Sequence, residues 1–189
     1  ERTLAKLLKT DEVEAKRIAD DFRARFNGHG EIAYIELLGD ISPWYKAIRT
    51  VKPRKYLPKF AEVNKLLGKL RRKGYLLGAI TDGPTIQGES ILRSAGISKQ
   101  HFNLFMGWES NAAQPKGGKS DVYTRVAALY NLDPENIVMV GDTLRLDVLP
   151  AIEAKLNAIH ISDIETPDAK WLTIKNVLEL NNIFLKEAV

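Results

Sequence analysis

Residues 136–147 read NIVMVGDTLRLD, and this stretch places two carboxylates just beyond an apolar run. The run Ile137–Val140 is typical of a buried parallel strand, because strands that are covered on both faces are apolar throughout. Asp142 follows Gly141 directly after the run, and Asp147 lies five residues further on. Carboxylates at the end of such a strand predict a site for a divalent cation. Taken alone, however, Gly-Asp is more often a turn, and Asp147 a carboxylate at a helix start.

The segments around this stretch alternate between helical and strand patterns. We expect helices at about 60–73, 85–94, 121–130, 146–154 and 177–185, and strands at 75–81, 103–106, 136–140, 158–161 and 171–174. In the helix at 121–130, Val122, Val126 and Leu129 are expected to face inward. Helices and strands in this order predict right-handed crossovers and a parallel sheet with helices on both faces. The fold class is therefore α/β, with a Rossmann-like, doubly wound sheet.

From Glu1 to about Tyr56 the pattern is helical instead. Asp11 and Glu14 form a capping-box-like start, after which Val13, Ile18, Phe22 and Phe26 keep one apolar side. Ser42-Pro43 predicts the start of a further helix, whereas residues 32–38 fit either a helix or a strand. We expect a small helical region at 1–56 beside a core at 57–189.

The composition excludes several classes of function. The 189 residues carry a formal net charge of +4 and no cysteine, which excludes disulfides and cysteine metal sites and is compatible with a cytoplasmic location. No apolar stretch approaches the roughly 18 residues of a membrane span, so we expect no membrane partner. The dense basic cluster at 69–73 fits a solvated helix end, and we expect no nucleic-acid partner.

Further polar residues are expected at the same edge of the sheet as Asp142. Thr81, Asp82 and Gly83 end the strand at 75–81, where a hydroxyl and backbone N–H groups can cradle a phosphoryl oxygen. A threonine that caps the next helix explains Thr81 equally well. A lysine would stabilise charge on a transferring phosphoryl group. Lys119, close to a predicted helix start, is favoured over Lys116, which lies farther out in a glycine-containing loop.

These pieces, in this order and spacing, resemble the haloacid dehalogenase (HAD) superfamily, whose members are mostly magnesium-dependent phosphatases. The matching segments are 52–58, 74–83, 95–102, 116–123 and 132–147. The resemblance implies a HAD-like core over about 52–189 and a helical cap in the earlier residues. It also implies that Thr81 is the second motif of the family, Lys119 or Lys116 the third, and Asp142 with Asp147 the fourth, which holds Mg²⁺.

The first motif of that family, an apolar strand ending in Asp-x-Asp, does not occur in the sequence. That motif supplies the nucleophile, and its strand lies between the strands at 75–81 and 136–140. Asp40 is the nearest candidate, but it lacks the second aspartate and follows the cap-like helices, so we do not assign it. Three explanations arise: the sequence lacks an N-terminal segment, the two strands pair directly, or another segment or chain fills the gap. We favour the first, because the sequence begins at Glu1 rather than Met.

The leading hypothesis is a phosphatase that acts on a small phosphorylated metabolite when an upstream Asp-x-Asp completes the site. Without that motif the chain itself is expected to be inactive. The alternative is a catalytically inactive relative with a binding or regulatory role. A haloacid dehalogenase is a weaker rival, since that reaction needs no magnesium and the paired Asp142 and Asp147 argue against it.

Overall fold

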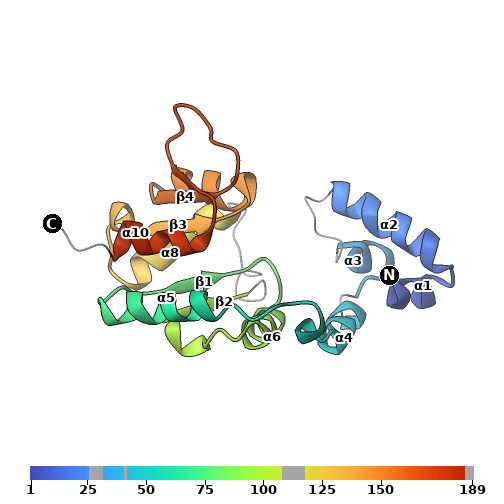
Figure 1. Ribbon diagram of the computed structural model, residues 1–189. Coiled ribbons are helices and arrows are strands. Elements are labelled where there is room, and N and C mark those ends of the chain that lie inside the picture. The colour runs from blue at the N-terminus through green and yellow to red at the C-terminus, as the bar shows by residue number, and fades with distance from the viewer. Residues whose placement is uncertain (26–31, 41, 108–117, 186–189) are drawn as a thin grey trace. The chain divides into compact units, whose positions relative to one another are not determined.

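The chain folds into two compact units, Glu1–Tyr56 and Leu57–Val189 (Figure 1). The computed structural model describes residues 1–25, 32–40, 42–107 and 118–185. Its described helices and strands coincide closely with the predicted alternation.

Helices make up the regular structure described in the first unit. They are α1 (Arg2–Leu8), α2 (Glu12–Arg25), α3 (Ile32–Leu38) and α4 (Ser42–Thr50), followed by a short 3₁₀ turn at Pro53–Lys55. Residues 32–38, which fitted either pattern, are therefore helical. Asp11 accepts a hydrogen bond from the N–H of Glu14 at 2.8 Å, as its capping position predicts.

The core of the first unit contains mostly small side chains from α2, which pack against α1 and α3. Ala15, Ala19 and Phe22 are buried there with Leu4. Val13 was expected on the same face but is 80% exposed, so that prediction is wrong. Ala15 and Ala19 lie four residues apart, so they share one face of α2. This buried face lies next to the one predicted from the larger apolar side chains.

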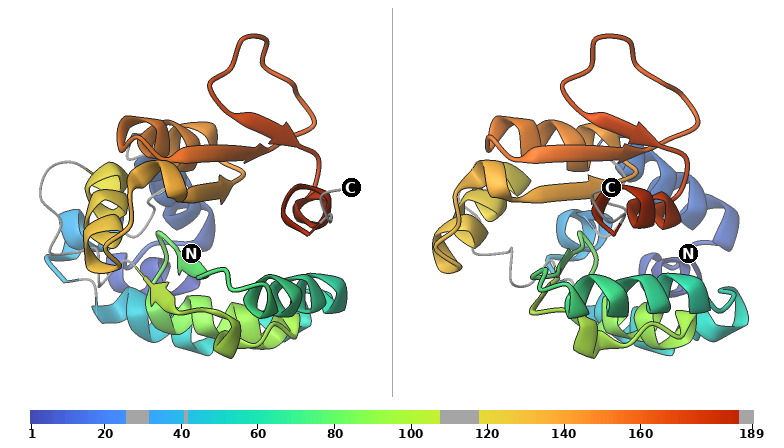
Figure 2. Two further views of the ribbon diagram at one scale, coloured as in Figure 1. Left: turned by 90° about the vertical axis from the view of Figure 1, so that its left-hand side faces the viewer. Right: turned by 60° about the vertical axis from the view of Figure 1, so that its left-hand side comes forward.

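The strands of the second unit are parallel and fall into two sheets (Figure 2). One sheet pairs β1 (Gly78–Ile80) with β2 (Leu104–Met106). The other has the order β3 (Val138–Gly141), β4 (Asn157–Ile161) and β5 (Leu172–Ile174). Each strand lies within a segment predicted as a strand or one residue beyond it, so the α/β class is confirmed.

The described helices of the second unit occupy the predicted positions along the chain. They are α5 (Ala61–Arg72), α6 (Thr85–Ala95), α8 (Gly118–Leu129), α9 (Leu149–Glu153) and α10 (Leu180–Phe184). A π-helical turn at Leu144–Val148 leads into α9, and 3₁₀ turns occupy 99–101, 134–136 and 177–179. Leu129 is 69% exposed, which contradicts its expected inward position, whereas Val122, Tyr123 and Ala127 are buried. The inward face of α8 is therefore rotated toward Tyr123.

Helices cover both faces of the three-stranded sheet. On one face, Met139 and Ala158 pack with Tyr123 of α8 and Ala151 of α9. On the other face, Ile159 packs with residues of α5 and α10. Because neighbouring residues of a strand point to opposite faces, Ala158 and Ile159 belong to different cores. This is the doubly wound arrangement that the sequence predicts.

The described strands β1 and β3 are not hydrogen-bonded to each other. In β1, Gly78 is exposed, and in β3, Val138 is 37% exposed, although both belong to apolar runs predicted to be buried. Direct pairing of these two strands, one of the three explanations considered from the sequence, is therefore wrong. Both strands keep one edge without a strand partner among the described residues.

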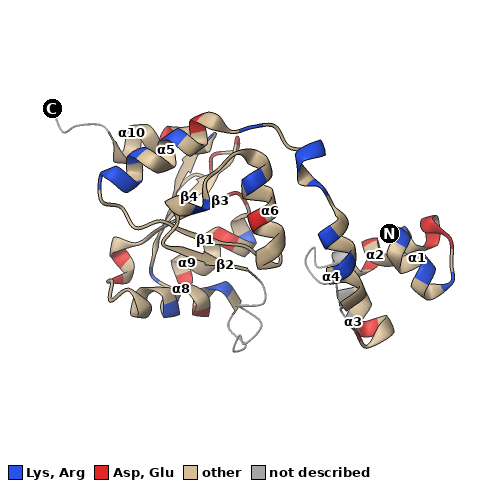
Figure 3. Ribbon diagram, turned by 90° about the horizontal axis from the view of Figure 1, so that it is seen from below, with Lys and Arg blue, Asp and Glu red and all other residues tan. Residues whose placement is uncertain are grey.

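Charged side chains are distributed over both units (Figure 3). The basic cluster at 69–73 lies at the C-terminal end of α5, as the sequence predicts. The helix dipole stabilises positive charges at that end. Within the described part of the chain, no helix combines the length and the apolar character needed to cross a membrane.

Candidate active site

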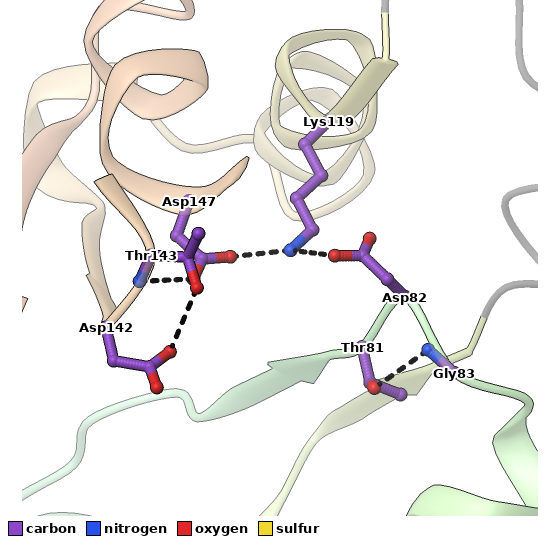
Figure 4. A network of polar contacts seen from close by, with 7 residues as sticks. All are labelled: Thr81, Asp82, Gly83, Lys119, Asp142, Thr143 and Asp147. Carbon is purple, nitrogen blue, oxygen red and sulfur yellow. Dashed lines mark hydrogen bonds and ion pairs between the residues drawn. The ribbon is translucent and has the colours of Figure 1, made fainter. Parts of the chain in front are cut away.

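Three separate segments of the second unit converge on one ammonium group (Figure 4). Lys119 is the second residue of α8, and its Nζ lies 2.9 Å from Oδ2 of Asp82 and 2.5 Å from Oδ1 of Asp147. Asp82 follows β1 by two residues, and Asp147 lies in the π-helical turn after β3. The structure thus brings together a lysine and two carboxylates that the sequence analysis singled out separately.

Lys119 keeps its positive charge in spite of its burial. Its side chain is only 9% exposed. Burial acts to lower the pKa of Lys119, but the hydrogen bonds and ion pairs with Asp147 and Asp82 outweigh it and raise the pKa above its ordinary value. The site therefore holds a permanent cation between two strand ends.

Tyr123 lies one helical turn after Lys119 on α8 and was missed by the sequence analysis. Its ring is buried, and burial raises the pKa of Tyr123 to about 12, with the charges of Lys119, Asp147 and Asp82 as smaller influences. The spacing of four residues from Lys119 is the signal that could have placed it on the same helix face. Tyr123 belongs to the apolar cluster that α8 and α9 form with β3 and β4.

Tyr123→Phe is expected to reduce the alkaline loss of stability. A tyrosine in the unfolded chain loses its proton near pH 10, whereas the folded protein retains this proton up to about pH 12. The protonated Tyr123 thus contributes fully to the free energy of unfolding below pH 10. As pH rises toward 12, the free energy of unfolding falls by about 2 kcal/mol because of this residue. Urea unfolding at pH 8, 10 and 12 measures this difference. Tyr56→Phe, at a position 78% exposed, is the control and should follow the unchanged protein. Identical curves for Tyr123→Phe and the unchanged protein would contradict the prediction.

Asp147 is held on both of its oxygens. Oδ1 binds Lys119, and Oδ2 accepts a hydrogen bond from the N–H of Thr143 at 3.1 Å. A Cβ atom at Gly141 would lie 2.5 Å from the Cβ of Asp147, so this close approach requires glycine. The sequence left open whether Asp147 binds a metal or orients another ligand. Its two protein contacts suit orientation, and the second lone pair of each oxygen still allows ligation.

Asp142 presents its carboxylate more freely. The side-chain contact recorded for it is with the hydroxyl of Thr143, at 3.5 Å. The backbone oxygen of Asp142 accepts a hydrogen bond from Nε2 of His160 at 3.2 Å. His160 is buried, and its Nδ1 has no partner among the described residues. The sequence analysis gave His160 no role, but it fixes the backbone at Asp142.

Asp142 and Asp147 offer carboxylate oxygens, the type of ligand that Mg²⁺ prefers. The described residues contain no group of three or more His, Cys, Asp or Glu that could hold a metal. Magnesium in phosphoryl-transfer sites takes one or two carboxylates and keeps waters and substrate oxygens as its other ligands. The exposed carboxylate of Asp142 and the oriented carboxylate of Asp147 match that smaller requirement.

The turn after β1 provides fewer donors than the sequence suggested. The N–H of Thr81 donates to the backbone oxygen of Met106 at 2.9 Å, and the N–H of Gly83 donates to Oγ1 of Thr81 at 3.1 Å. The Thr81 hydroxyl therefore remains able to donate its own proton, as does the N–H of Asp82 as far as the described contacts show. Thr81 does not cap α6. Its hydroxyl oxygen accepts a hydrogen bond from the N–H of Gly83, which precedes that helix.

The remaining sequence candidates lie elsewhere. Lys116 is outside the described residues. Asp40 belongs to the first unit, where Oδ1 accepts a hydrogen bond from the N–H of Ser42 at 2.8 Å. Hydrogen bonds from Ser42 lower the pKa of Asp40. Asp40 therefore acts at the start of α4.

Comparison with known structures supports the fold. A HAD phosphatase from Thermococcus onnurineus aligns over 100% of this chain and 87% of its own, with a TM-score of 0.68 and 21% identity. A putative beta-phosphoglucomutase from Thermotoga maritima aligns over 97% of this chain and 88% of its own, with a TM-score of 0.63 and 16% identity. At these identities the likeness concerns the fold alone.

Comparison with known sequences identifies the family. The glyceraldehyde 3-phosphate phosphatase of Pyrococcus furiosus is 32% identical over 98 residues, which are 51% of this chain and 39% of that protein. The matched part thus spans well under half the length of this relative. The profile of the haloacid dehalogenase-like hydrolases matches residues 3–155. The chain therefore belongs to the haloacid dehalogenase-like hydrolases.

Proposed function

We propose that this chain supplies the cap and most of the core of a magnesium-dependent phosphatase for a small phosphorylated metabolite. The observation that carries the proposal is the convergence of Asp82 and Asp147, from the ends of β1 and β3, on the ammonium group of Lys119. The name of the Pyrococcus relative makes a three-carbon phosphorylated aldehyde a suitable first substrate to test. The helical unit 1–56 is proposed as the cap that selects the substrate, and a cytoplasmic location stays a prediction from the sequence.

The nucleophile is proposed to enter with a strand between β1 and β3. No Asp-x-Asp occurs in the 189 residues, and these two strands have no hydrogen bonds to each other. A parallel strand there would satisfy both edges and would place its last residues beside Thr81 and Asp142. The resemblance to the family predicts that such a strand ends in Asp-x-Asp.

In the complete site, the residues of this chain bind and neutralise the phosphoryl group. The Thr81 hydroxyl donates to one phosphoryl oxygen, and the remaining N–H of Lys119 donates to another. Asp142 and the oriented Asp147 would hold Mg²⁺, which would offset negative charge on the phosphoryl group. The added aspartate attacks phosphorus, the bond to the ester oxygen breaks, and the leaving alcohol takes a proton from the second aspartate of the motif. Water, which gives a proton back to that second aspartate, then attacks the aspartyl phosphate, releases phosphate and restores the first aspartate.

Phosphatase assays test the proposal. They compare this chain with a version extended ahead of Glu1 by a segment that carries Asp-x-Asp, native to the gene or supplied by design. With Mg²⁺ and glyceraldehyde 3-phosphate or p-nitrophenyl phosphate, the extended version is expected to release phosphate and the present chain is not. An extended version that folds yet hydrolyses no phosphoester would favour the inactive binding or regulatory relative instead.

Asp142→Asn in the extended version is expected to lower activity about a hundredfold, because an amide is a poorer ligand for Mg²⁺ than a carboxylate. Asp133→Asn is the matched control. Asp133 is an exposed aspartate ahead of β3, at the opposite end of the strand, and its side chain caps no helix. Initial rates over a range of Mg²⁺ concentrations measure the effect. Equal rates for the two variants would exclude Asp142 as a metal ligand.

A further inference from the structure

The ammonium group of Lys119 has most of its hydrogen-bond donors engaged by protein carboxylates before any substrate is present. It has three N–H donors, of which one binds Asp147 and one binds Asp82. Its side chain is 9% exposed, so water has little access to it. A phosphoryl oxygen that binds Lys119 must therefore take the third donor or displace a carboxylate.

The carboxylates at the site outnumber its cation. Asp82, Asp142 and Asp147 carry three negative charges, and Lys119 is the cation recorded in ion pairs with them among the described residues. A metal ion held by Asp142 and Asp147 would offset two of these charges. Asp82 does not form a metal-binding group with those two among the described residues, so its charge would be offset by Lys119 alone.

Asp82 is also the residue next to Thr81, whose hydroxyl is proposed to donate a hydrogen bond to a phosphoryl oxygen. In Figure 4 its carboxylate reaches from the turn after β1 toward Lys119. Because Oδ2 of Asp82 lies 2.9 Å from Nζ of Lys119, a phosphate bound by Lys119 would lie close to this carboxylate, and two negative charges so close repel each other.

We propose that Asp82 makes phosphate binding depend on a divalent cation. Asp82 occupies one N–H donor of Lys119 and adds a negative charge next to Thr81. Phosphate therefore binds tightly only when a metal at Asp142 and Asp147 offsets negative charge at the site. This inference rests on the proposed function and names Asp82 as the residue that controls the order of binding.

Asp82→Asn tests the effect of the negative charge separately from the size of the side chain. Asparagine has nearly the same size, and its side-chain oxygen can still accept a hydrogen bond from Lys119. Asp82 is 36% exposed, so the variant is expected to fold, which a thermal unfolding curve verifies. Asp82→Glu retains the charge, and Asp133→Asn removes one charge at the far end of β3.

Calorimetric titration of the 189-residue chain with inorganic phosphate, with EDTA and then with Mg²⁺, tests the proposal. Without metal, Asp82→Asn is expected to bind phosphate about tenfold more tightly than the unchanged chain. Mg²⁺ should reduce the difference in phosphate affinity between Asp82→Asn and the unchanged chain. Asp133→Asn should behave like the unchanged chain, and Asp82→Glu, which keeps the charge, should show no gain in phosphate affinity without metal.

The outcomes separate this inference from the proposed function. If the unchanged chain binds phosphate with Mg²⁺ but Asp82→Asn binds no more tightly without it, the inference is wrong and the phosphate site stands. Weaker binding by Asp82→Asn would mean that Asp82 positions Lys119 for phosphate and does not oppose binding. If no variant binds phosphate in either condition, the proposed phosphate site itself fails, and the role of Asp82 fails with it.

Discussion

Lys119→Met is expected to destabilise the second unit by about 2 kcal/mol and to abolish phosphate binding. The change removes a cation that is 9% exposed and leaves Asp82 and Asp147 facing each other without compensation. Loss of one partner from a buried ion pair costs about 3–5 kcal/mol, and the partial exposure of Asp82 places our expectation lower. Urea unfolding at neutral pH measures the change in stability, and phosphate titration with Mg²⁺ measures binding.

The control for this substitution is Lys69→Met. Lys69 is an exposed lysine on α5 for which no ion pair is recorded, and lysine and methionine have similar helix propensities. The double variant Lys119→Met/Asp82→Asn should lose less stability than the sum of its single changes, because it contains one unpaired carboxylate fewer. Additive losses would show that Asp82 and Lys119 do not interact in solution.

Gly141→Ala is expected to destabilise the protein by about 3 kcal/mol and to disrupt the metal end of the site. The added methyl group would lie 2.5 Å from Cβ and 2.8 Å from Cγ of Asp147, well inside van der Waals contact. Overpacking of this kind costs about 1–3 kcal/mol, and here Asp147 must also leave Lys119 and Thr143. Unfolding experiments measure stability, and calorimetric titration with Mg²⁺ measures metal binding.

Gly78→Ala provides the comparison. Gly78 lies in β1, and a Cβ there meets Leu104 at 3.8 Å, an ordinary contact. This variant should remain within about 0.5 kcal/mol of the unchanged protein. If Gly141→Ala were as well tolerated as Gly78→Ala, the close approach of Asp147 to β3 would not exist in solution.

Local sequence patterns predicted most of the helices and strands. The apolar run at 137–140 and the helix ending near Gly74 are recognisable because each depends on neighbouring residues only. Inward faces were less predictable. Val13 and Leu129 are apolar and correctly spaced, yet both are exposed, because smaller or more polar neighbours such as Ala15 and Tyr123 face the core instead. Which stripe of a helix is buried depends on what packs against it.

The sequence by itself determined that strand ends would carry Thr81, Asp142 and Asp147 and that a lysine would start the helix between them. Only the tertiary structure decided that Lys119 binds Asp82 and Asp147 together, and that β1 and β3 remain unpaired. Lys119 lies 37 residues from Asp82 and 28 from Asp147, and no local pattern encodes a contact across such separations. Ion pairs of this kind form where the packing of sheets and helices places the charged groups within reach, which the order of residues along the chain does not specify.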